Sequence, residues 1–186
     1  MVVGETLKSI IESKINGFYQ INHTYLRDER GSFNTWFSID IGSGMHTEFH
    51  TKQANTSTSS KGVIRGIHFS DKSHVQHKVV TCIDGEIIDY GVDLRKESKT
   101  FKEFDAVVLN STKANSVFIE SGVGHAFEVL SKQATIVYLL SEVWKPDLEY
   151  TLNLFDKEID IPWITKRPLL SKRDSSAQHL SEHNNI

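Results

Sequence analysis

The clearest pattern in the chain is a series of short segments in which hydrophobic and polar positions alternate. In "EIIDYGVDL", Ile88, Tyr90, Val92 and Leu94 fall on one face of an extended strand, and the residues between them fall on the other. The segments "AVVLN", "NSVFIE", "GHAFEVLS" and "ATIVYLLSEVW" follow at intervals of roughly 8 to 14 residues, separated by Gly, Ser, Asn or Lys. Many short strands at even spacing, with few helices, predict a β-sandwich or barrel.

The two ends of the chain depart from this pattern. In "ETLKSIIES", residues 5–13, Leu7, Ile10 and Ile11 recur at helical spacing, which predicts a short amphipathic helix within an N-terminal helical extension, residues 1–14. The last stretch, "SSAQHLSEHNNI", is polar and predicts a flexible tail over residues 175–186. Between them "HTKQANTSTSSKG" is rich in hydroxyl groups and is typical of a loop or a polar strand. Without a repeat or a linker, the sequence predicts one domain over residues 1–186.

Composition narrows the possible functions. The formal net charge is -3 over 186 residues and there is no extended basic block, which argues against a nucleic-acid partner. The apolar runs are too short to span a membrane, and no signal-peptide pattern precedes the strands, so we expect neither a membrane partner nor secretion. Cys82 is the only cysteine, which excludes an internal disulfide and fits a cytoplasmic location.

One strand segment contains charged side chains that an apolar environment would not accept. "KGVIRGIHFS", residues 61–70, places Arg65 and His68 among β-branched and aromatic residues. Burying both would cost several kcal/mol unless each found a partner or faced a ligand cavity. Three positions separate them, so a regular strand would send them to opposite faces. A bulge at Gly66 would turn both side chains toward one cavity.

Other ionisable residues lie in or beside predicted strands, namely His74, His77, Lys78, His125 and Tyr138. Taken singly, each is more often a hydrogen-bonded core or surface residue than a catalyst. In a small barrel, however, several such residues together favour a functional site, because inward side chains converge on one interior. Cys82, in "KVVTCIDGE", is instead expected to be a small core residue. Glycine-rich phosphate loops, nucleophile elbows and paired cysteines do not occur in the sequence.

The histidines also allow a metal site. Ligands for a transition metal could come from His68, His74, His77 and His125. The carboxylate expected at a short spacing from a His-x-His pair is missing, and His74 and His77 are better explained by a solvated loop. A metal-dependent enzyme therefore remains the alternative rather than the main hypothesis.

The ordered set "GVIRGIHF", "HKVV", "GEIIDYGVDLRKESKTF", "SGVGHAFEVLS", "VYLLSEVW" and "LLSKRD" resembles the nucleotide-sugar 3,5-epimerase family, whose type member is dTDP-4-dehydrorhamnose 3,5-epimerase. The resemblance covers roughly residues 15–175. It implies an all-β, cupin-like double-stranded β-helix (jelly roll) with short flanking helices. It also implies a homodimer with exchanged N-terminal strands, a dTDP-linked sugar substrate, deoxysugar biosynthesis, and no metal or other cofactor.

The resemblance implies catalytic roles for four residues and substrate contacts for several more. His68 matches the base, Asp174 its acidic partner and Tyr138 the general acid, while Lys78 lines the sugar end of the site. The implied substrate-binding residues are Arg65, His125, Gln53, Asn55, Arg30, Trp144, Glu149 and Arg173. Trp144 is expected to stack on the nucleotide base.

The sequence departs from the family pattern at positions that we expect to surround the substrate. Thr35 replaces a usual glutamate, and Glu120, Ser121 and Glu128 replace the usual proline and glycine around "GVGHAF". The exact sugar, and whether C3, C5 or both are inverted, therefore stay open. Besides a metal-dependent enzyme, a non-catalytic sugar-nucleotide binding protein is the other alternative, although it would not need His68 and Tyr138 together.

Overall fold

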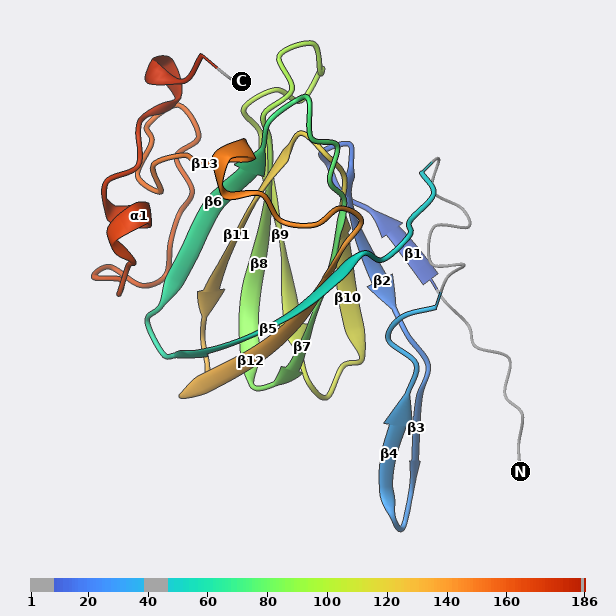
Figure 1. Ribbon diagram of the computed structural model, residues 1–186. Coiled ribbons are helices and arrows are strands. Elements are labelled where there is room, and N and C mark those ends of the chain that lie inside the picture. The colour runs from blue at the N-terminus through green and yellow to red at the C-terminus, as the bar shows by residue number, and fades with distance from the viewer. Residues whose placement is uncertain (1–8, 39–46, 185) are drawn as a thin grey trace.

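The computed structural model describes residues 9–38, 47–184 and 186, which form two antiparallel β-sheets packed face to face (Figure 1). The six-stranded sheet contains, in spatial order, β1 (Ser9–Glu12), β2 (Phe18–Asn22), β10 (Asn115–Ile119), β7 (Lys78–Asp84), β12 (Gln133–Leu140) and β5 (Gln53–Ser60). The five-stranded sheet contains β13 (Glu149–Thr151), β6 (Ile64–Ser70), β11 (Val123–Val129), β8 (Glu86–Asp93) and β9 (Phe104–Asn110). This arrangement is a jelly roll, as predicted.

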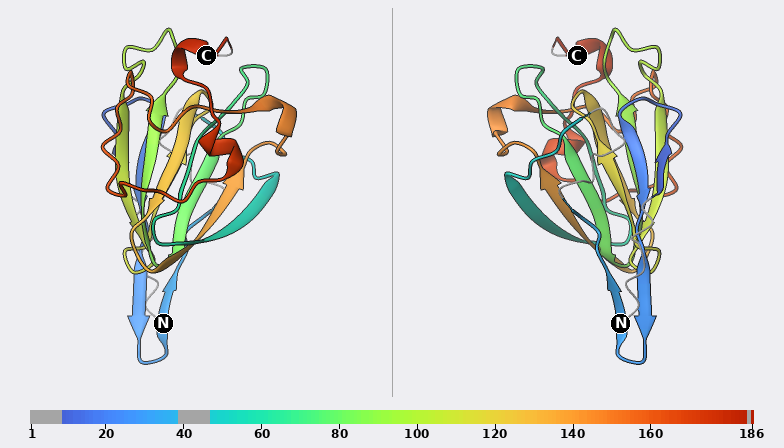
Figure 2. Two further views of the ribbon diagram at one scale, coloured as in Figure 1. Left: turned by 90° about the vertical axis from the view of Figure 1, so that its left-hand side faces the viewer. Right: turned by 90° about the vertical axis from the view of Figure 1, so that its right-hand side faces the viewer.

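Within the residues that the structure describes, a separate hairpin and three short helices complete the fold. The hairpin consists of β3 (Tyr25–Asp28) and β4 (Gly31–Asn34), and it projects well beyond the two sheets (Figures 1 and 2). The helices are η2 (Pro146–Leu148), α1 (Lys172–Ser175) and η3 (Leu180–Glu182). Within the described residues, none of these helices has the length and apolarity needed to cross a bilayer.

Among the described residues, one apolar cluster lies between the sheets and two lie on their outer faces, and one end of the interior is polar. The cluster between the sheets includes Val80, Phe127 and Ile136. Cys82 belongs to it and is buried, so its predicted core role is confirmed, and burial raises the pKa of its thiol to about 11. The outer face of the six-stranded sheet carries a smaller cluster around Phe118. The outer face of the five-stranded sheet is covered by the C-terminal segment.

The predicted bulge in β6 is present and decides which side chains face the interior. Ile64 and Ile67 are three residues apart, yet both are fully buried in the same outer cluster. Arg65 and His68 are likewise three apart, and both line the interior cavity. The extra residue is Gly66, opposite which the pairing of β6 with β11 shifts register. The bulge therefore brings both charged side chains to one face.

Gly66 is required at this position for two physical reasons. Its φ of 133° lies in the region that residues with a Cβ rarely adopt. A Cβ built on Gly66 would also lie 2.4 Å from the Cβ of Ala126 on β11, well inside contact distance. Replacing Gly66 would therefore displace either the bulge or β11.

The N-terminal helix prediction is wrong for the residues that the structure describes. Residues 9–12 form β1, which pairs with β2 from Ser9↔Asn22 to Glu12↔Tyr19. Of the rest of the predicted helix, Ser13 follows the strand without helical structure, and residues 5–8 lie outside the described residues. A sheet edge offers backbone partners that an isolated short helix lacks, so sheet pairing overrides the weak helical periodicity.

The C-terminal segment is packed against the domain, so the prediction of a free tail is also wrong. Leu180 and Ile186 are buried in the cluster on the outer face of the five-stranded sheet. Gln178 forms a parallel bridge with Leu152, and the backbone N–H of Leu180 donates to the Asp156 carboxylate at 2.7 Å. The polar composition concealed these anchors because only two of the side chains are large and apolar.

Candidate active site

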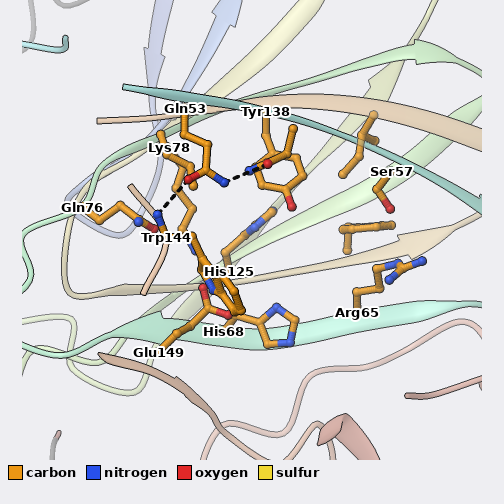
Figure 3. Close-up of a pocket in the computed structure, with 14 residues that line it drawn as sticks. Gln53, Ser57, Arg65, His68, Gln76, Lys78, His125, Tyr138, Trp144 and Glu149 are labelled. Atoms are coloured by element: carbon orange, nitrogen blue, oxygen red, sulfur yellow. Dashed lines mark hydrogen bonds between the residues drawn. The ribbon is translucent and has the colours of Figure 1, made fainter. Parts of the chain in front are cut away.

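A cavity of about 340 Å³ opens between the two sheets at their polar end (Figure 3). It brings together most of the predicted site residues, namely Gln53, Asn55, Arg65, His68, Lys78, His125, Tyr138, Trp144 and Glu149. Sequence reasoning missed other lining residues, namely Ser57, Gln76, Phe127, Ile136 and Leu140. Ser57 could have been predicted, because alternate residues of a strand share one face and Ser57 follows Gln53 and Asn55 at that spacing along the polar strand β5.

His68 is held by a carboxylate from a distant part of the chain. Its Nε2 lies 2.7 Å from Oδ1 of Asp174, whose side chain is only 3% exposed. The hydroxyl of Ser171 donates to the other carboxylate oxygen at 2.8 Å. Because a carboxylate only accepts hydrogen bonds, Nε2 carries the proton, and Nδ1 is left with its lone pair for a ligand.

The charge state of Asp174 follows from competing effects. Burial alone would raise its pKa, but the hydrogen bond and charge of His68, with further help from Ser171 and Arg173, hold the pKa below its ordinary value. Asp174 is therefore ionised at neutral pH. An ionised carboxylate stabilises the imidazolium that forms when Nδ1 accepts a proton.

Tyr138 faces His68 from the other sheet, across the cavity (Figure 3). Burial raises the pKa of its phenol, the charge of Glu149 raises it further, and Arg65 opposes both. Tyr138 therefore keeps its proton at neutral pH. The cavity thus places a proton acceptor and a proton donor on opposite walls.

Lys78 places a buried amino group in the cavity between these walls. The residue is 8% exposed, and burial lowers the pKa of its ammonium while the charges of Glu149 and Asp89 oppose that shift. Asp89, which is fully buried, accepts a hydrogen bond from Nε2 of His125 at 2.9 Å. Asp89 was not predicted as a site residue, although the alternation in β8 had placed it opposite the apolar face.

Gln53, Asn55 and Trp144 form a connected group at the mouth of the cavity. The Gln53 amide donates to Oδ1 of Asn55 at 2.9 Å and accepts from the backbone N–H of Trp144 at 2.8 Å (Figure 3). The Trp144 side chain is 43% exposed there, so one ring face is accessible to a planar ligand. Arg65 is exposed and is oriented by Ser59, whose Oγ accepts from Nε at 3.1 Å.

Two predicted binding residues do not line this cavity. Arg173 contacts Glu149, with Nη1 lying 3.0 Å from Oε1 and Nη2 lying 2.8 Å from the backbone oxygen. Arg30 lies at the turn of the β3–β4 hairpin, 85% exposed and paired with Asp28. Within one chain, Arg30 is therefore outside the cavity.

The four histidines considered as metal ligands do not converge. His68 and His125 line the cavity, whereas His74 bonds the backbone oxygen of Val143 and His77 stacks on Phe118. His74 is buried and His77 half-buried, so the prediction of a solvated loop is wrong for both. In the part of the chain that the structure describes, no group of three His, Cys, Asp or Glu side chains is arranged to hold a metal ion.

Glu120 and Glu128, which depart from the family pattern, do not line the cavity, although they were expected to surround the substrate. Glu128 is fully buried on the outer side of β11, where it accepts hydrogen bonds from the backbone N–H groups of Ile164 and Thr165 at 3.1 and 2.5 Å. Burial and the Glu128 charge raise the pKa of Tyr90 to about 12. Glu120 accepts a hydrogen bond from the hydroxyl of Thr47 and does not line the cavity either. The side chain at position 128 points away because 128 has the opposite strand parity from His125.

A jelly roll whose interior presents an imidazole–carboxylate pair facing a phenol is suited to acid–base proton transfer, which is the chemistry of an epimerising isomerase. The family model described as dTDP-4-dehydrorhamnose 3,5-epimerase matches residues 12–182. The chain belongs to this family, as its sequence motifs had indicated, and the cupin-like fold is that of the family.

Individual relatives agree with this assignment. A dTDP-4-dehydrorhamnose 3,5-epimerase of Mycolicibacterium smegmatis is 38% identical over 92% of this chain and 85% of its own length. A dTDP-4-dehydrorhamnose 3-epimerase of Streptomyces niveus is 37% identical over 90% of this chain and 82% of its own.

Solved structures are similar over nearly the whole chain. A 4-keto-6-deoxy sugar epimerase from the novobiocin biosynthetic gene cluster of Streptomyces spheroides superposes with a TM-score of 0.91 and 35% identity, covering 98% of this chain and 92% of that one. The dTDP-6-deoxy-D-glucose-3,5-epimerase of Legionella pneumophila, in complex with dTDP-4-keto-L-rhamnose, superposes with a TM-score of 0.90 and 30% identity. The match covers 95% of this chain and 94% of that one.

Proposed function

We propose that this protein inverts C3, C5 or both centres of a dTDP-4-keto-6-deoxy sugar in deoxysugar biosynthesis. The observation that carries the proposal is the placement of the His68–Asp174 pair and Tyr138 on facing walls of one cavity. The Legionella relative binds dTDP-4-keto-L-rhamnose, and the Streptomyces relatives include epimerases of both the one-centre and two-centre type by name, which supports this substrate class.

Proton abstraction falls to His68. The ketone at C4 acidifies the hydrogens on C3 and C5, because the carbanion formed at either carbon is delocalised onto the carbonyl oxygen. Nδ1 of His68 accepts the proton while Nε2 stays hydrogen-bonded to Asp174. The carboxylate favours the charged imidazolium and fixes the orientation of the ring.

The negative charge that develops on the C4 oxygen needs a compensating cation. Lys78 is the buried cation of the cavity, and it lies close enough to Asp89 and Glu149 for both charges to act on it. Because Lys78 is buried, its positive charge contributes more to the stability of an enolate than it would in solution. We therefore assign the stabilisation of the enolate to Lys78.

Inversion requires that the new proton arrive from the face opposite to the base. Tyr138 comes from the sheet that faces His68, and its raised pKa keeps it protonated before the reaction. The phenol donates its proton to the carbanionic carbon and the phenolate is later reprotonated. Base and acid thus differ, and every proton transfer uses a side chain of the protein, so we expect no cofactor.

Binding of the nucleotide diphosphate occurs at the cavity mouth. Arg65 is suited to a phosphate because a guanidinium binds two oxygens at once, and Trp144 offers a ring face to the base. Gln53 and Asn55 lie beside Trp144. Binding energy from these remote groups positions the sugar against His68.

The protein is also proposed to act as a cytoplasmic homodimer. The projecting β3–β4 hairpin supports this, because Leu26 and Phe33 are paired across it and are 47% and 66% exposed. In a dimer with exchanged N-terminal strands, the hairpin would carry Arg30 to the cavity of the partner.

The proposed function is tested by solvent exchange. The protein is incubated with dTDP-4-keto-6-deoxyglucose in deuterium oxide, and the sugar is analysed by mass spectrometry and NMR. Deuterium at both C3 and C5 is expected of a two-centre epimerase, and deuterium at one carbon of a single-centre enzyme. No deuterium at either carbon, in this substrate or in its amino- and dideoxy-sugar analogues, would contradict the proposal.

A further inference from the structure

The helix that carries Asp174 cannot hold its own position. α1 is four residues long, and a helix of that length is unstable unless its surroundings fix it. Before α1, the chain is tied to the start of the base-bearing strand β6. The backbone N–H of Leu169 donates to Gly62 O at 2.8 Å, and that of Ile64 donates to Leu169 O at 3.3 Å. The N-terminal side of the helix is therefore anchored.

After α1, the first anchor along the chain is Asn153, ahead of the contacts of Leu180 with Asp156. Its backbone N–H donates to Gln178 O at 2.9 Å, and its side-chain Nδ2 donates to Ala177 O at 3.0 Å. Its Oδ1 accepts from the backbone N–H of Phe155 at 2.9 Å, which fixes the orientation of the amide. Asn153 thus holds Ala177 and Gln178, the second and third residues after the end of α1.

The same segment is also bonded to the strand that carries the base. Leu152, next to Asn153, exchanges two backbone hydrogen bonds with Ile67, at 2.9 and 3.3 Å. Ile67 immediately precedes His68, and Thr151 is the partner of His68 in the β13–β6 pairing. Residues 151–153 therefore join the strand that carries His68 to the segment that follows Asp174.

We propose that Asn153 is a positioning residue that sets the distance between His68 and Asp174, although it does not line the cavity. The kinetic effect of this residue rests on the proposed function, whereas its effect on the distance between His68 and Asp174 does not. Asn153→Ala keeps the backbone bond to Gln178 but removes the side-chain bond to Ala177. The carboxylate then loses its fixed position, so proton abstraction slows while substrate binding is retained.

Asn115 provides a matched control. Its Nδ2 donates to Val108 O at 2.8 Å and its Oδ1 accepts from the Asn110 N–H, so its side chain makes the same two kinds of bond at a site away from the cavity. We expect Asn153→Ala to lower kcat for deuterium exchange about tenfold or more with KM little changed, the effect of a small misplacement of a catalytic group. Asn115→Ala should lose stability but retain kcat. Equal losses of kcat in the two variants would overturn the proposal.

A double-mutant cycle separates positioning from a general structural effect. If Asn153 acts through Asp174, Asn153→Ala should have little further effect on kcat in an Asp174→Ala background. The same factor in both backgrounds would overturn the proposal, since it would mean that Asn153 acts by another route.

Crystal structures of the wild type and both asparagine variants test the inference without any substrate. The His68–Asp174 contact should be intact in the wild type and Asn115→Ala, and lengthened or lost in Asn153→Ala. An Asn153→Ala structure that keeps this contact would overturn the inference whatever the enzyme acts on. Failure of the wild type to exchange deuterium into any of the sugars would instead contradict the proposed function alone.

Discussion

The carboxylate of Asp174 lies 2.7 Å from Nε2 of His68, although 106 positions separate the two residues in the chain. One partner is on the bulged strand β6 and the other is on the short helix α1, next to which the C-terminal segment is anchored. The contact depends on both the bulge and the packed C-terminus. It connects the stability of the fold with the chemistry of the site, and the first prediction concerns this connection.

Asp174→Asn should destabilise the protein in a pH-dependent way. The pKa of Asp174 is lowered from its ordinary value of 3.8 in the folded state, so its contribution to stability is present above that value and disappears as the pH falls through the folded pKa. The variant should be less stable than the wild type at pH 7, and the difference should shrink below about pH 3.8. Urea denaturation across this range measures it. Asp147→Asn, at an exposed position, is the control, and a pH-independent deficit in Asp174→Asn would contradict the prediction.

His68→Ala should abolish exchange at every centre that the wild type exchanges, because a single imidazole is proposed to remove each proton. Loss of a general base typically costs about 10²- to 10⁴-fold in rate. Calorimetry with dTDP should show nearly unchanged nucleotide affinity, since Arg65 and Trp144 remain. Exchange near the wild-type rate would show that His68 is not the base.

Tyr138→Phe should separate proton removal from product formation. The variant retains His68 and can still form the enolate, but it lacks the donor on the opposite face of the sugar. We expect inverted product to decrease more than the release of deuterium from C3- or C5-labelled substrate, both followed in one NMR time course. Equal decreases would argue that Tyr138 is not the acid.

Glu128→Ala should be a stability variant with an intact site. It would remove two hydrogen bonds between a buried carboxylate and the backbone N–H groups of Ile164 and Thr165, at a cost of about 2 to 4 kcal/mol in the free energy of unfolding. Glu158→Ala removes an exposed pair with Lys102 and should cost less than about 1 kcal/mol. Denaturation gives both values, and dTDP affinity should be unchanged. A loss of dTDP affinity in the folded Glu128→Ala variant would mean that the residue affects the cavity after all.

Arg30 offers a test of the proposed dimer. If its hairpin completes the site of the partner, mixing Arg30→Ala with His68→Ala subunits should restore activity. In a mixed dimer, one cavity would receive an intact Arg30 from the His68→Ala chain and an intact His68 from its own chain. Subunits are exchanged by partial denaturation and renaturation, and sedimentation measures the oligomeric state. Activity that stays at the level of the separate variants would contradict a shared site.

The all-β fold was predictable because it depends on local patterns, and most of the cavity lining was predicted through the resemblance to the epimerase family. Alternation in β8 correctly assigned Tyr90 and Val92 to one apolar cluster, since strand geometry alone sends alternate side chains to opposite faces. Gly66 between Arg65 and His68 predicted the bulge for the same reason: two charged side chains three positions apart can share a cavity only if one residue is added. The motifs of the family identified His68 and Tyr138 as a pair.

Tertiary structure decided the features that depend on contacts between distant segments. Residues 9–12 have helical spacing but form an edge strand, because β2 offers hydrogen-bond partners that periodicity cannot indicate. The polar C-terminus is fixed by Leu180 and by Asn153, and neither anchor is evident without the surface onto which the segment folds. The sequence by itself therefore determined how side chains alternate along each strand, since that follows from strand geometry. The family motifs had named Asp174 as the partner of His68, but only the tertiary structure brings this carboxylate within 2.7 Å of the imidazole, since that contact closes a loop through long-range packing.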